Sequence, residues 1–311
     1  MSVFEVFSDG EPEVSPIWVA RVFRLAAWRI QEERLEGRTG VALGACADAI
    51  ASASDLGRQS LIGSMIGTGL IDAGARPCAA AVESGSAAER RMFEESARVA
   101  RKKWPAFGRI LEKERLFLQL GFFGSRVSER ARARLPPEAG SLLRRDKDLP
   151  PPFERTSMQA VRCAVFGGYA YRRYVEQYGQ LIDAAALPPR EAAQKYDELH
   201  EMVELADVLT ANHEVFGEWK TMWAPFHARV LQGEAMLDGL IALAEAVSVK
   251  EQGGTWPVSW DFLQSAPNAH PVRCPNTGSV LPLAEEGTGA WLVIPASDGR
   301  EDSRPVAMGR M

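Results

Sequence analysis

The chain has 311 residues, of which 46% are hydrophobic and 25% are charged, and its net charge is −5 at pH 7. This balance is typical of a globular protein whose length suits one large domain or two smaller ones. It excludes an overall basic surface for binding nucleic acid. The sequence also contains no uninterrupted apolar run of membrane-spanning length, so no membrane span is predicted.

Residues 1–15 are predicted to be a flexible N-terminus, followed by a helical domain over residues 16–252. The stretch from Met1 to Pro16 is acidic and lacks the basic and then apolar order of a secretory signal. A cytoplasmic location is therefore predicted for the sequence as written. Ser15 and Pro16 favour a helix start, because proline fits the first helical position.

The helix that begins at Pro16 is expected to end at Gly37. Its residues divide into an apolar side with Trp18, Val22, Leu25 and Trp28, and a polar side with Arg29, Glu32, Glu33 and Glu36. This division predicts that the apolar side faces the core and that the polar side faces water.

A helix predicted over residues 55–73 contains the glycines Gly57, Gly63, Gly67 and Gly69. Glycine costs a helix roughly 1 kcal/mol relative to alanine, so these glycines need a compensating contact. We expect a neighbouring helix to pack closely over Gly63 and Gly67. A membrane dimer motif is the alternative, but the polar residues Arg58, Gln59 and Asp72 leave too short an apolar span.

Three local patterns follow in the middle of the chain. Ser86 and Glu89 have the spacing of a capping box, which predicts a helix start. Glu112, Glu114 and Arg115 fit either an inward-facing polar site or a solvated helix face with ion pairs at i,i+3. Prolines at both ends of a charged stretch predict an internal linker over residues 135–156.

The C-terminal part begins with a long helix. From Pro225 to Val247 the apolar residues recur at three- and four-residue steps, and two glycines follow at 253 and 254. This pattern predicts one helix with a single buried stripe. The prolines and glycines beyond it exclude another long helix. The short runs 279–283 and 290–294 are instead predicted to pair as a β-hairpin.

The order after this helix is Gly-x-Trp-Pro, then HPVRCPNTGSVLPL, then GAWLVIPASDGRED. It resembles the C-terminal half of type II secretion pseudopilins. It resembles more closely a group of uncharacterised bacterial proteins that carry such a tail behind an all-helical region. The matching positions are Trp256, Pro257, Pro275, Thr277, Gly278, Leu281, Asp298, Gly299 and Asp302. Cys274, Ile294 and Ala296 depart from the pattern, where an Asp, a Tyr and a Gly are usual.

The resemblance implies a pseudopilin-like β-rich tail over residues 253–303, with a flexible C-terminus over residues 304–311. In pseudopilins a loop near the end of such a tail can bind calcium, and Asp298, Glu301 and Asp302 are the calcium candidates here. Because few ligands are present and an upstream Asp is replaced, the tail is predicted to be structural and to hold no calcium. The resembling proteins often start with a membrane anchor, which implies an envelope-associated location if an N-terminal anchor has been removed.

The cysteines Cys46, Cys78, Cys163 and Cys274 stand far apart in the sequence, and no C-x-x-C motif is present. A zinc site of the usual spacing is therefore excluded, and a dense disulfide framework does not suit a chain of this length. Buried free thiols are predicted.

The histidines give two weak metal patterns. His200 and His213 each begin an H-E-x-x sequence, but the second histidine of a zinc-protease motif is missing. Asp197, His200, Glu201 and Glu204 lie close together on one predicted helix and are the candidates for a transition-metal site. No second Glu-x-x-His pattern completes a carboxylate-bridged centre, so no metal or other cofactor is predicted.

These patterns predict a mainly α fold: an irregular helical bundle, partly solenoid-like, with a small β-rich C-terminal module packed on the last long helix. Trp291 and the apolar residues after it are expected to cover Trp256, Trp260 and that helix. The predicted function is that of a non-enzymatic interaction or scaffolding protein with an unknown protein partner, which the resemblance links to the envelope or to secretion. The alternative is a metal-dependent or hydrolytic enzyme with a site between helices near His200 and His213.

Overall fold

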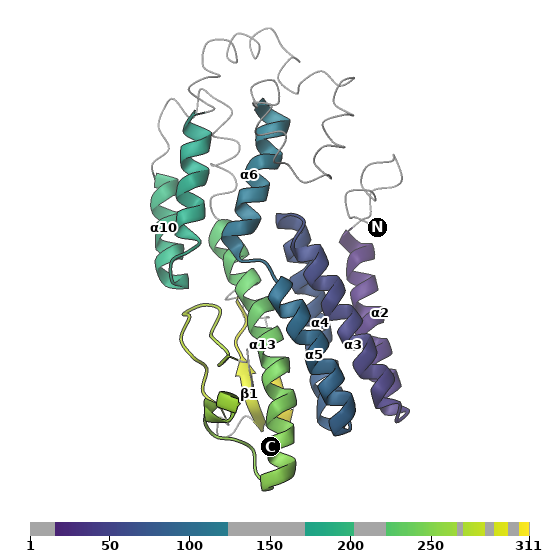
Figure 1. Cartoon of the computed structure of the whole chain (residues 1–311). Helices are drawn as coiled ribbons and strands as arrows, with labels where there is room; N and C mark the ends of the chain where they lie inside the picture. Colours follow the sequence, from purple (N-terminus) through teal and green to yellow (C-terminus); the bar gives the residue numbers. More distant parts are fainter. Residues whose placement is uncertain are drawn as a thin grey trace. The chain divides into compact units, whose positions relative to one another are not determined.

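The computed structural model describes residues 16–123, 172–201, 222–265, 270–283, 289–297 and 305–310 (Figure 1). It confirms the predicted fold class, because the chain is mainly helical and carries a small two-stranded antiparallel sheet near the C-terminus. Within the range 16–252, the described residues form helices and turns without a strand. The predicted linker over residues 135–156 lies outside the described residues.

The elements have these bounds in chain order: α2 Pro16–Leu35, α3 Thr39–Gly57, α4 Leu61–Ser84, α5 Ala87–Lys103, α6 Phe107–Phe123, a helix over 172–184, α10 Pro189–Glu201, α13 Trp223–Gly253, the 3-10 helix η3 Trp260–Ser265, and the strands β1 Ala290–Ile294 and β2 Val306–Arg310. They fall into two compact units. One comprises Met1–Ala106 and Pro225–Met311, and the other comprises Phe107–Ala224. The tail thus shares a unit with the N-terminal helices, whereas the sequence predicts a division between 16–252 and 253–303.

The helices α3 and α4 pack closely because α4 presents glycines to the backbone of α3. A methyl group added at Gly63 would overlap the Leu56 carbonyl oxygen, and one added at Gly67 would overlap the Ala53 carbonyl oxygen. The prediction that both glycines lie against a neighbouring helix is therefore confirmed.

The bounds of α4 differ from the predicted helix over residues 55–73. The preceding helix α3 continues to Gly57, and α4 begins after Ser60, whose side chain accepts a hydrogen bond from the Gly63 N–H at 3.0 Å. Although proline disfavours a helix interior, α4 then runs through Pro77 to Ser84. Buried residues near this proline hold the helix in place: Gly74, Ala75, Cys78, Ala79, Ala81 and Val82.

Cys46 of α3 and Cys78 of α4 form a disulfide bond, with 5.7 Å between their Cα atoms. The prediction of free thiols is wrong for these two cysteines. It is confirmed for Cys274, which is free and buried, and Cys163 lies outside the described residues. The two bonded cysteines are 32 residues apart in sequence, and the packing of α4 back along α3 brings them together.

The helix α13 is the central helix of its unit. Over residues 235–247 every position except Asp238 and Glu245 is buried, so the prediction of a single buried stripe is wrong. A helix that is apolar nearly all round belongs in a core. Two glycines of α13 let neighbouring side chains approach it closely. Gly233 faces Trp104, which follows α5, and Gly239 faces Ile294 of β1 and Met308 of β2.

The sheet of the tail pairs β1 with β2 in antiparallel register, with Leu292 opposite Met308. The predicted hairpin between 279–283 and 290–294 is wrong, because the partner of β1 is β2. The first of those runs meets β1 through an isolated bridge between Leu283 and Leu292. The strand β2 lies within residues 304–311, for which the sequence predicts a flexible C-terminus.

Trp291 of β1 is the centre of an aromatic cluster in the tail. Its side chain is fully buried, and it stacks on Trp256 with 5.8 Å between the ring centroids. Trp260 and Phe262 meet it edge-on at 6.0 and 5.9 Å. The indole N–H of Trp291 donates to the Pro257 carbonyl oxygen at 2.9 Å. The predicted packing of Trp291 on Trp256 and Trp260 is confirmed.

The second unit has an aromatic core of its own. Tyr174 and Tyr178, both in the helix over 172–184, have ring centroids 4.8 Å apart, and Tyr178 meets Trp223 edge-on at 6.1 Å. Phe107 of α6 meets Tyr196 of α10 edge-on at 6.5 Å. These contacts join α6 and α10 within the unit.

Gly67→Ala should lower the free energy of unfolding by about 1–3 kcal/mol, because the added methyl group meets the backbone of α3. Denaturant unfolding followed by circular dichroism measures the change. Gly44→Ala on α3 is the matched control, since no atom beyond its chain neighbours and the nearby backbone of its own helix lies within 4 Å of the added group. Alanine there should stabilise the helix by roughly 0.5–1 kcal/mol. Equal stability of the two variants would contradict the close packing of α4 on α3.

Trp291→Ala should lower the free energy of unfolding by about 3–5 kcal/mol, because it removes a fully buried indole. Asp298→Ala combined with Asp302→Ala should leave the melting temperature unchanged, with or without calcium. The reason is that buried apolar side chains, and not an ion, are expected to stabilise the tail. Thermal unfolding compares the proteins. A large calcium-dependent rise in melting temperature that the double substitution abolishes would show that a bound ion stabilises the tail more than its buried apolar side chains do.

Candidate functional site

The predicted transition-metal site falls largely outside the described side chains. Asp197 lies on α10 with an exposed side chain, and His200 and Glu201 are the last residues of that helix. Glu204 and His213 lie outside the described residues. Among the side chains that the structure describes, no group of three or more His, Cys, Asp or Glu residues could hold a metal ion. The metal site and the alternative enzyme near His200 and His213 stay predictions.

The calcium candidates cannot be placed in the tail. Asp298, Glu301 and Asp302 belong to the segment that connects β1 to β2, and all three lie outside the described residues. The expectation that the tail holds no calcium therefore stays a prediction.

Two buried titratable groups are neutral at pH 7. Burial raises the pKa of Tyr174 far above its usual range, and its hydroxyl donates to the Arg115 carbonyl oxygen at 3.0 Å. Burial lowers the pKa of His227 on α13 to about 4. In the predicted polar site at 112–115, Glu112 pairs with Arg109 at 2.9 Å, and the Arg109 side chain is exposed. This pair fits a solvated helix face.

A ladder of ion pairs joins α5 to α13. Arg101 contacts Asp238 at 2.7 Å and also contacts Glu234, and Arg98 contacts Glu245 at 3.1 Å. Asp238 and Glu245 are the two positions in the central stretch of α13 that are not buried. Both carboxylates that interrupt the apolar surface of α13 therefore face arginines of α5.

Burial and charge oppose each other in this ladder. Burial lowers the pKa of Arg101, but hydrogen bonding to Asp238 and the charges of Asp238 and Glu234 outweigh that effect and raise it. Burial raises the pKa of Glu234, while the charge of Arg101 lowers it. A carboxylate taken out of water is tolerated when such a partner is present. The ladder is thus a structural contact that fixes α5 on α13.

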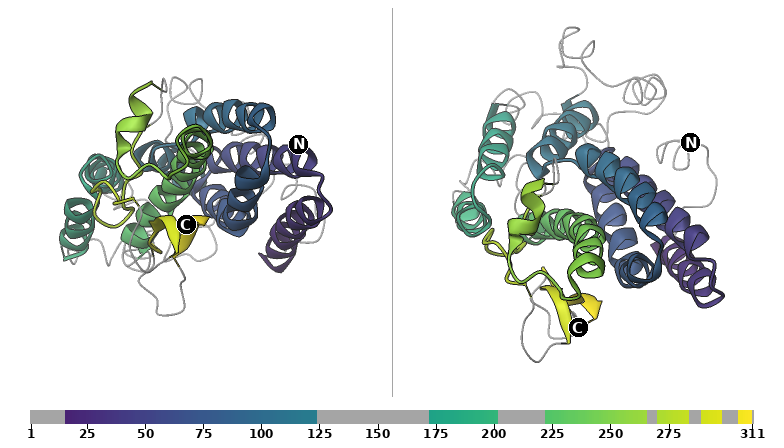
Figure 2. Two further views of the ribbon diagram at one scale, coloured as in Figure 1. Left: turned by 90° about the horizontal axis from the view of Figure 1, so that it is seen from below. Right: turned by 60° about the horizontal axis from the view of Figure 1, so that its bottom comes forward.

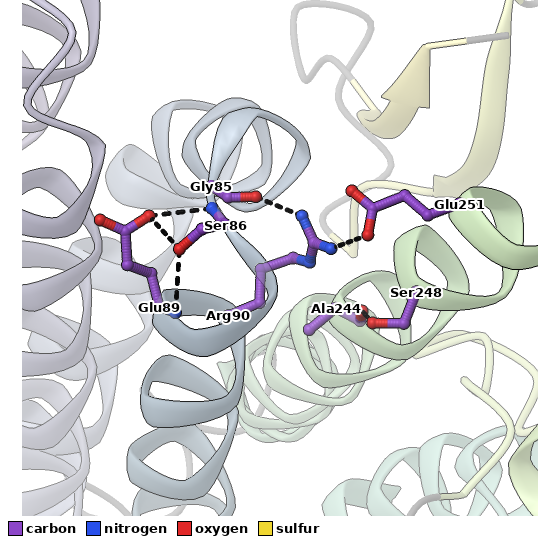
Figure 3. Close-up of polar contacts among 7 residues, drawn as sticks. All are labelled: Gly85, Ser86, Glu89, Arg90, Ala244, Ser248 and Glu251. Atoms are coloured by element: carbon purple, nitrogen blue, oxygen red, sulfur yellow. Dashed lines mark hydrogen bonds and ion pairs between the residues drawn. The ribbon is translucent and has the colours of Figure 1, made fainter.

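Arg90 lies at one end of the ladder, and it is buried. Its guanidinium donates to the Gly85 carbonyl oxygen and to Glu251 of α13 (Figure 3). Beside it the predicted capping box is confirmed: the Ser86 N–H donates to the Glu89 carboxylate at 2.8 Å, and the Glu89 N–H donates to the Ser86 hydroxyl at 3.4 Å. Arg90 therefore connects the turn between α4 and α5 to the C-terminal part of α13.

The helix α2 has apolar residues on two opposite sides. Phe23, Ala26 and Ile30 pack into the core beside α3 and α4. The other side carries large apolar residues that are 58–69% exposed: Val22, Leu25, Trp28 and Leu35. We call these four residues the outer α2 face. The prediction that Val22, Leu25 and Trp28 face the core is wrong, because Phe23 and Ile30 take that place.

The outer α2 face lies at the edge of the N-terminal helices. In the views of Figures 1 and 2, α2 is the outermost of α2 to α5, with α3 and α4 on its inner side. Phe23 anchors it there, because its ring lies over Gly69 of α4, 3.3 Å from the position that a Cβ atom would take. Four large apolar side chains on one side of a helix form a patch, whereas single exposed residues are ordinary. This patch is the candidate functional site.

Comparison with protein-family models, with curated proteins and with solved structures found no match to this chain. Among the residues that the structure describes, no helix has both the length and the apolar character needed to cross a bilayer.

Proposed function

We propose that this chain is a non-enzymatic interaction or scaffolding protein that binds a protein partner through the outer α2 face. The observation that supports the proposal is the exposure of four large apolar side chains on one side of a helix whose other side is packed. An apolar helix face that the described part of the chain leaves exposed is typical of a surface that binds another helix. Trp28 at its centre is the residue type that most often dominates binding energy.

The rest of the unit is a suitable support for such a surface. The disulfide between Cys46 and Cys78 joins α3 to α4, and the packed side of α2 rests on these two helices. A binding surface that is already ordered loses little conformational entropy when a partner docks. The outer α2 face is therefore presented in a fixed position.

We also propose that the protein works in the oxidising part of a bacterial envelope. The bond between Cys46 and Cys78 supports this location, because disulfides persist in oxidising compartments and are rare in the cytosol. The resemblance of residues 253–303 to type II secretion pseudopilins favours the same location. This proposal departs from the cytoplasmic location predicted from the first residues of the sequence.

Leu25→Glu combined with Trp28→Glu should abolish capture of protein partners from a lysate of the native cells. The introduced carboxylates would have to be desolvated in any apolar contact with this face. Affinity capture and mass spectrometry measure the captured set. Met92→Glu is the matched control, because Met92 is 70% exposed on another helix, α5; it should capture what the unchanged chain captures. Equal capture by the double variant would overturn the assignment of this face.

The bond between Cys46 and Cys78 should already exist in the native cell. Thiols trapped with a maleimide in acid-quenched cells should be equal in number for the unchanged chain and for Cys46→Ala combined with Cys78→Ala. Additional free thiols in the unchanged chain would contradict an oxidising compartment. On the loop-entropy model, loss of a bond that closes 32 residues should also lower the free energy of unfolding by about 3–4 kcal/mol.

A further inference from the structure

We propose that the ladder between α5 and α13 takes up protons in mildly acidic solution and holds the two helices together more firmly there than at neutral pH. This device is separate from the outer α2 face and does not depend on the function proposed above. It rests on an excess of carboxylates. Among the residues that the structure describes, the two arginines of the ladder contact four carboxylates: Glu94, Glu234, Asp238 and Glu245.

Arg98 has one closely held carboxylate and one additional partner. It donates to a single Glu94 oxygen through Nε, at 2.7 Å, and through Nη2. The same Nη2 donates to a Glu245 oxygen at 3.1 Å. Two carboxylate oxygens therefore meet at one nitrogen atom, and Glu245 is the additional partner.

Arg101 repeats this arrangement one turn further along α5. Its Nε and Nη2 hold the two oxygens of Asp238 at 2.7 and 3.2 Å. Its Nη2 also donates to Glu234. A bidentate pair already matches the charge of a guanidinium, so Glu234 is the additional partner. Both additional carboxylates thus come from α13.

Partial burial makes the excess charge costly. All six side chains of these two clusters are between 14 and 33% exposed. Two carboxylates that share such a site repel each other when both are ionised. One proton on the additional carboxyl of each cluster removes this repulsion, and the protonated group can donate a hydrogen bond. Because the docked helices bring these groups together, proton uptake favours the docked state.

The pKa directions agree with the geometry. Burial raises the pKa of Glu245, and hydrogen bonding to Glu94 and the charge of Glu94 raise it further, whereas Arg98 lowers it. Burial also raises the pKa of Glu234, against the charge of Arg101. A carboxyl with a raised pKa in the folded chain stabilises folding below its unfolded pKa. That contribution is lost as the pH rises through the folded pKa.

Other groups contribute to the pH response of the whole chain. Burial lowers the pKa of His227, so its protonation in acid favours the unfolded chain and opposes the effect of the ladder. The elements packed here carry further charged residues, which include Arg91 and Glu95 of α5, Lys250 and Glu251 of α13, and Asp48 and Asp55 of α3. The contribution of the ladder is therefore measured as a difference between variants at the same pH.

Glu245→Gln tests the excess charge, because glutamine keeps the size of the side chain and resembles the protonated carboxyl. Native-state hydrogen exchange of peptides from α5 and α13 measures how often these helices open. At pH 7 both should exchange about two- to fivefold more slowly in the variant than in the unchanged chain, which is the range of partly exposed charge contacts. The difference should narrow as the pH falls towards about 4, where the carboxyl of the unchanged chain is protonated.

Two further variants separate excess charge from an ordinary ion pair. Adding Glu94→Gln to Glu245→Gln should make exchange faster than in Glu245→Gln alone, because Arg98 then loses both of its carboxylates. Glu251→Gln is the matched control on α13, since Glu251 is the carboxylate that contacts buried Arg90 (Figure 3). Its loss should make exchange at pH 7 faster than in the unchanged chain.

Exchange at pH 7 that is equal or faster in Glu245→Gln than in the unchanged chain would overturn the inference. Either result would show that the Glu245 carboxylate causes no net repulsion in the docked helices. A gain that persists unchanged after Glu94→Gln is added would overturn it as well, because the gain would then not depend on the pairing of Arg98.

Discussion

The arginines of α5 allow α13 to occupy the middle of its unit. This helix is buried over nearly its whole circumference between residues 235 and 247, yet it carries Asp238 and Glu245 there. Desolvating a carboxylate without a partner costs several kcal/mol. Arg98 and Arg101 offset part of that cost, and they do so from one side only. The remaining sides of α13 are then free to pack against apolar neighbours and the tail.

The pairing of α5 with the acidic side of α13 determines how the other helices of the unit pack. Because α5 must face the acidic side of α13, the turn between α4 and α5 is fixed, and buried Arg90 ties it to Glu251. The glycines of α4 then bring α3 against it, and the packed side of α2 settles on both. Among the residues that the structure describes, these contacts leave the outer α2 face uncovered. Its exposure is therefore a result of how the core is filled.

The elements that could be predicted from the sequence carry a local chemical signal. Ser86 and Glu89 cap α5 as their spacing indicates, and Gly254, at a φ of 77°, follows the end of α13. The predictions that are wrong concern features that depend on contacts between distant segments. Nothing local pairs Cys46 with Cys78, and nothing in the run 290–294 indicates that its partner is β2 and not the nearer run 279–283.

The candidate site, too, could be predicted from the sequence only in part. Three of its four residues are recognisable from the sequence as one apolar side of a helix, but the direction in which that side faces is not, because two series in α2 have helical spacing. Val22, Leu25 and Trp28 form one series, and Phe23, Ala26 and Ile30 form the other. Which series is buried depends on Gly69, in another helix, where the Phe23 ring fits. Periodicity alone identifies an apolar helix face, but it does not determine whether that face is buried in the core or exposed to water.

The first unit is built from two segments that are far apart in the sequence, so they are synthesised at different times. Its first part, Met1–Ala106, leaves the ribosome long before Pro225–Met311, which supplies α13. In that interval the surface that α13 will cover is open and prone to wrong contacts. The disulfide lies wholly within the early part, so the bond between α3 and α4 needs no residue of the later part. A nascent chain arrested before residue 225 would keep this unfinished surface, and would be a natural substrate for chaperones.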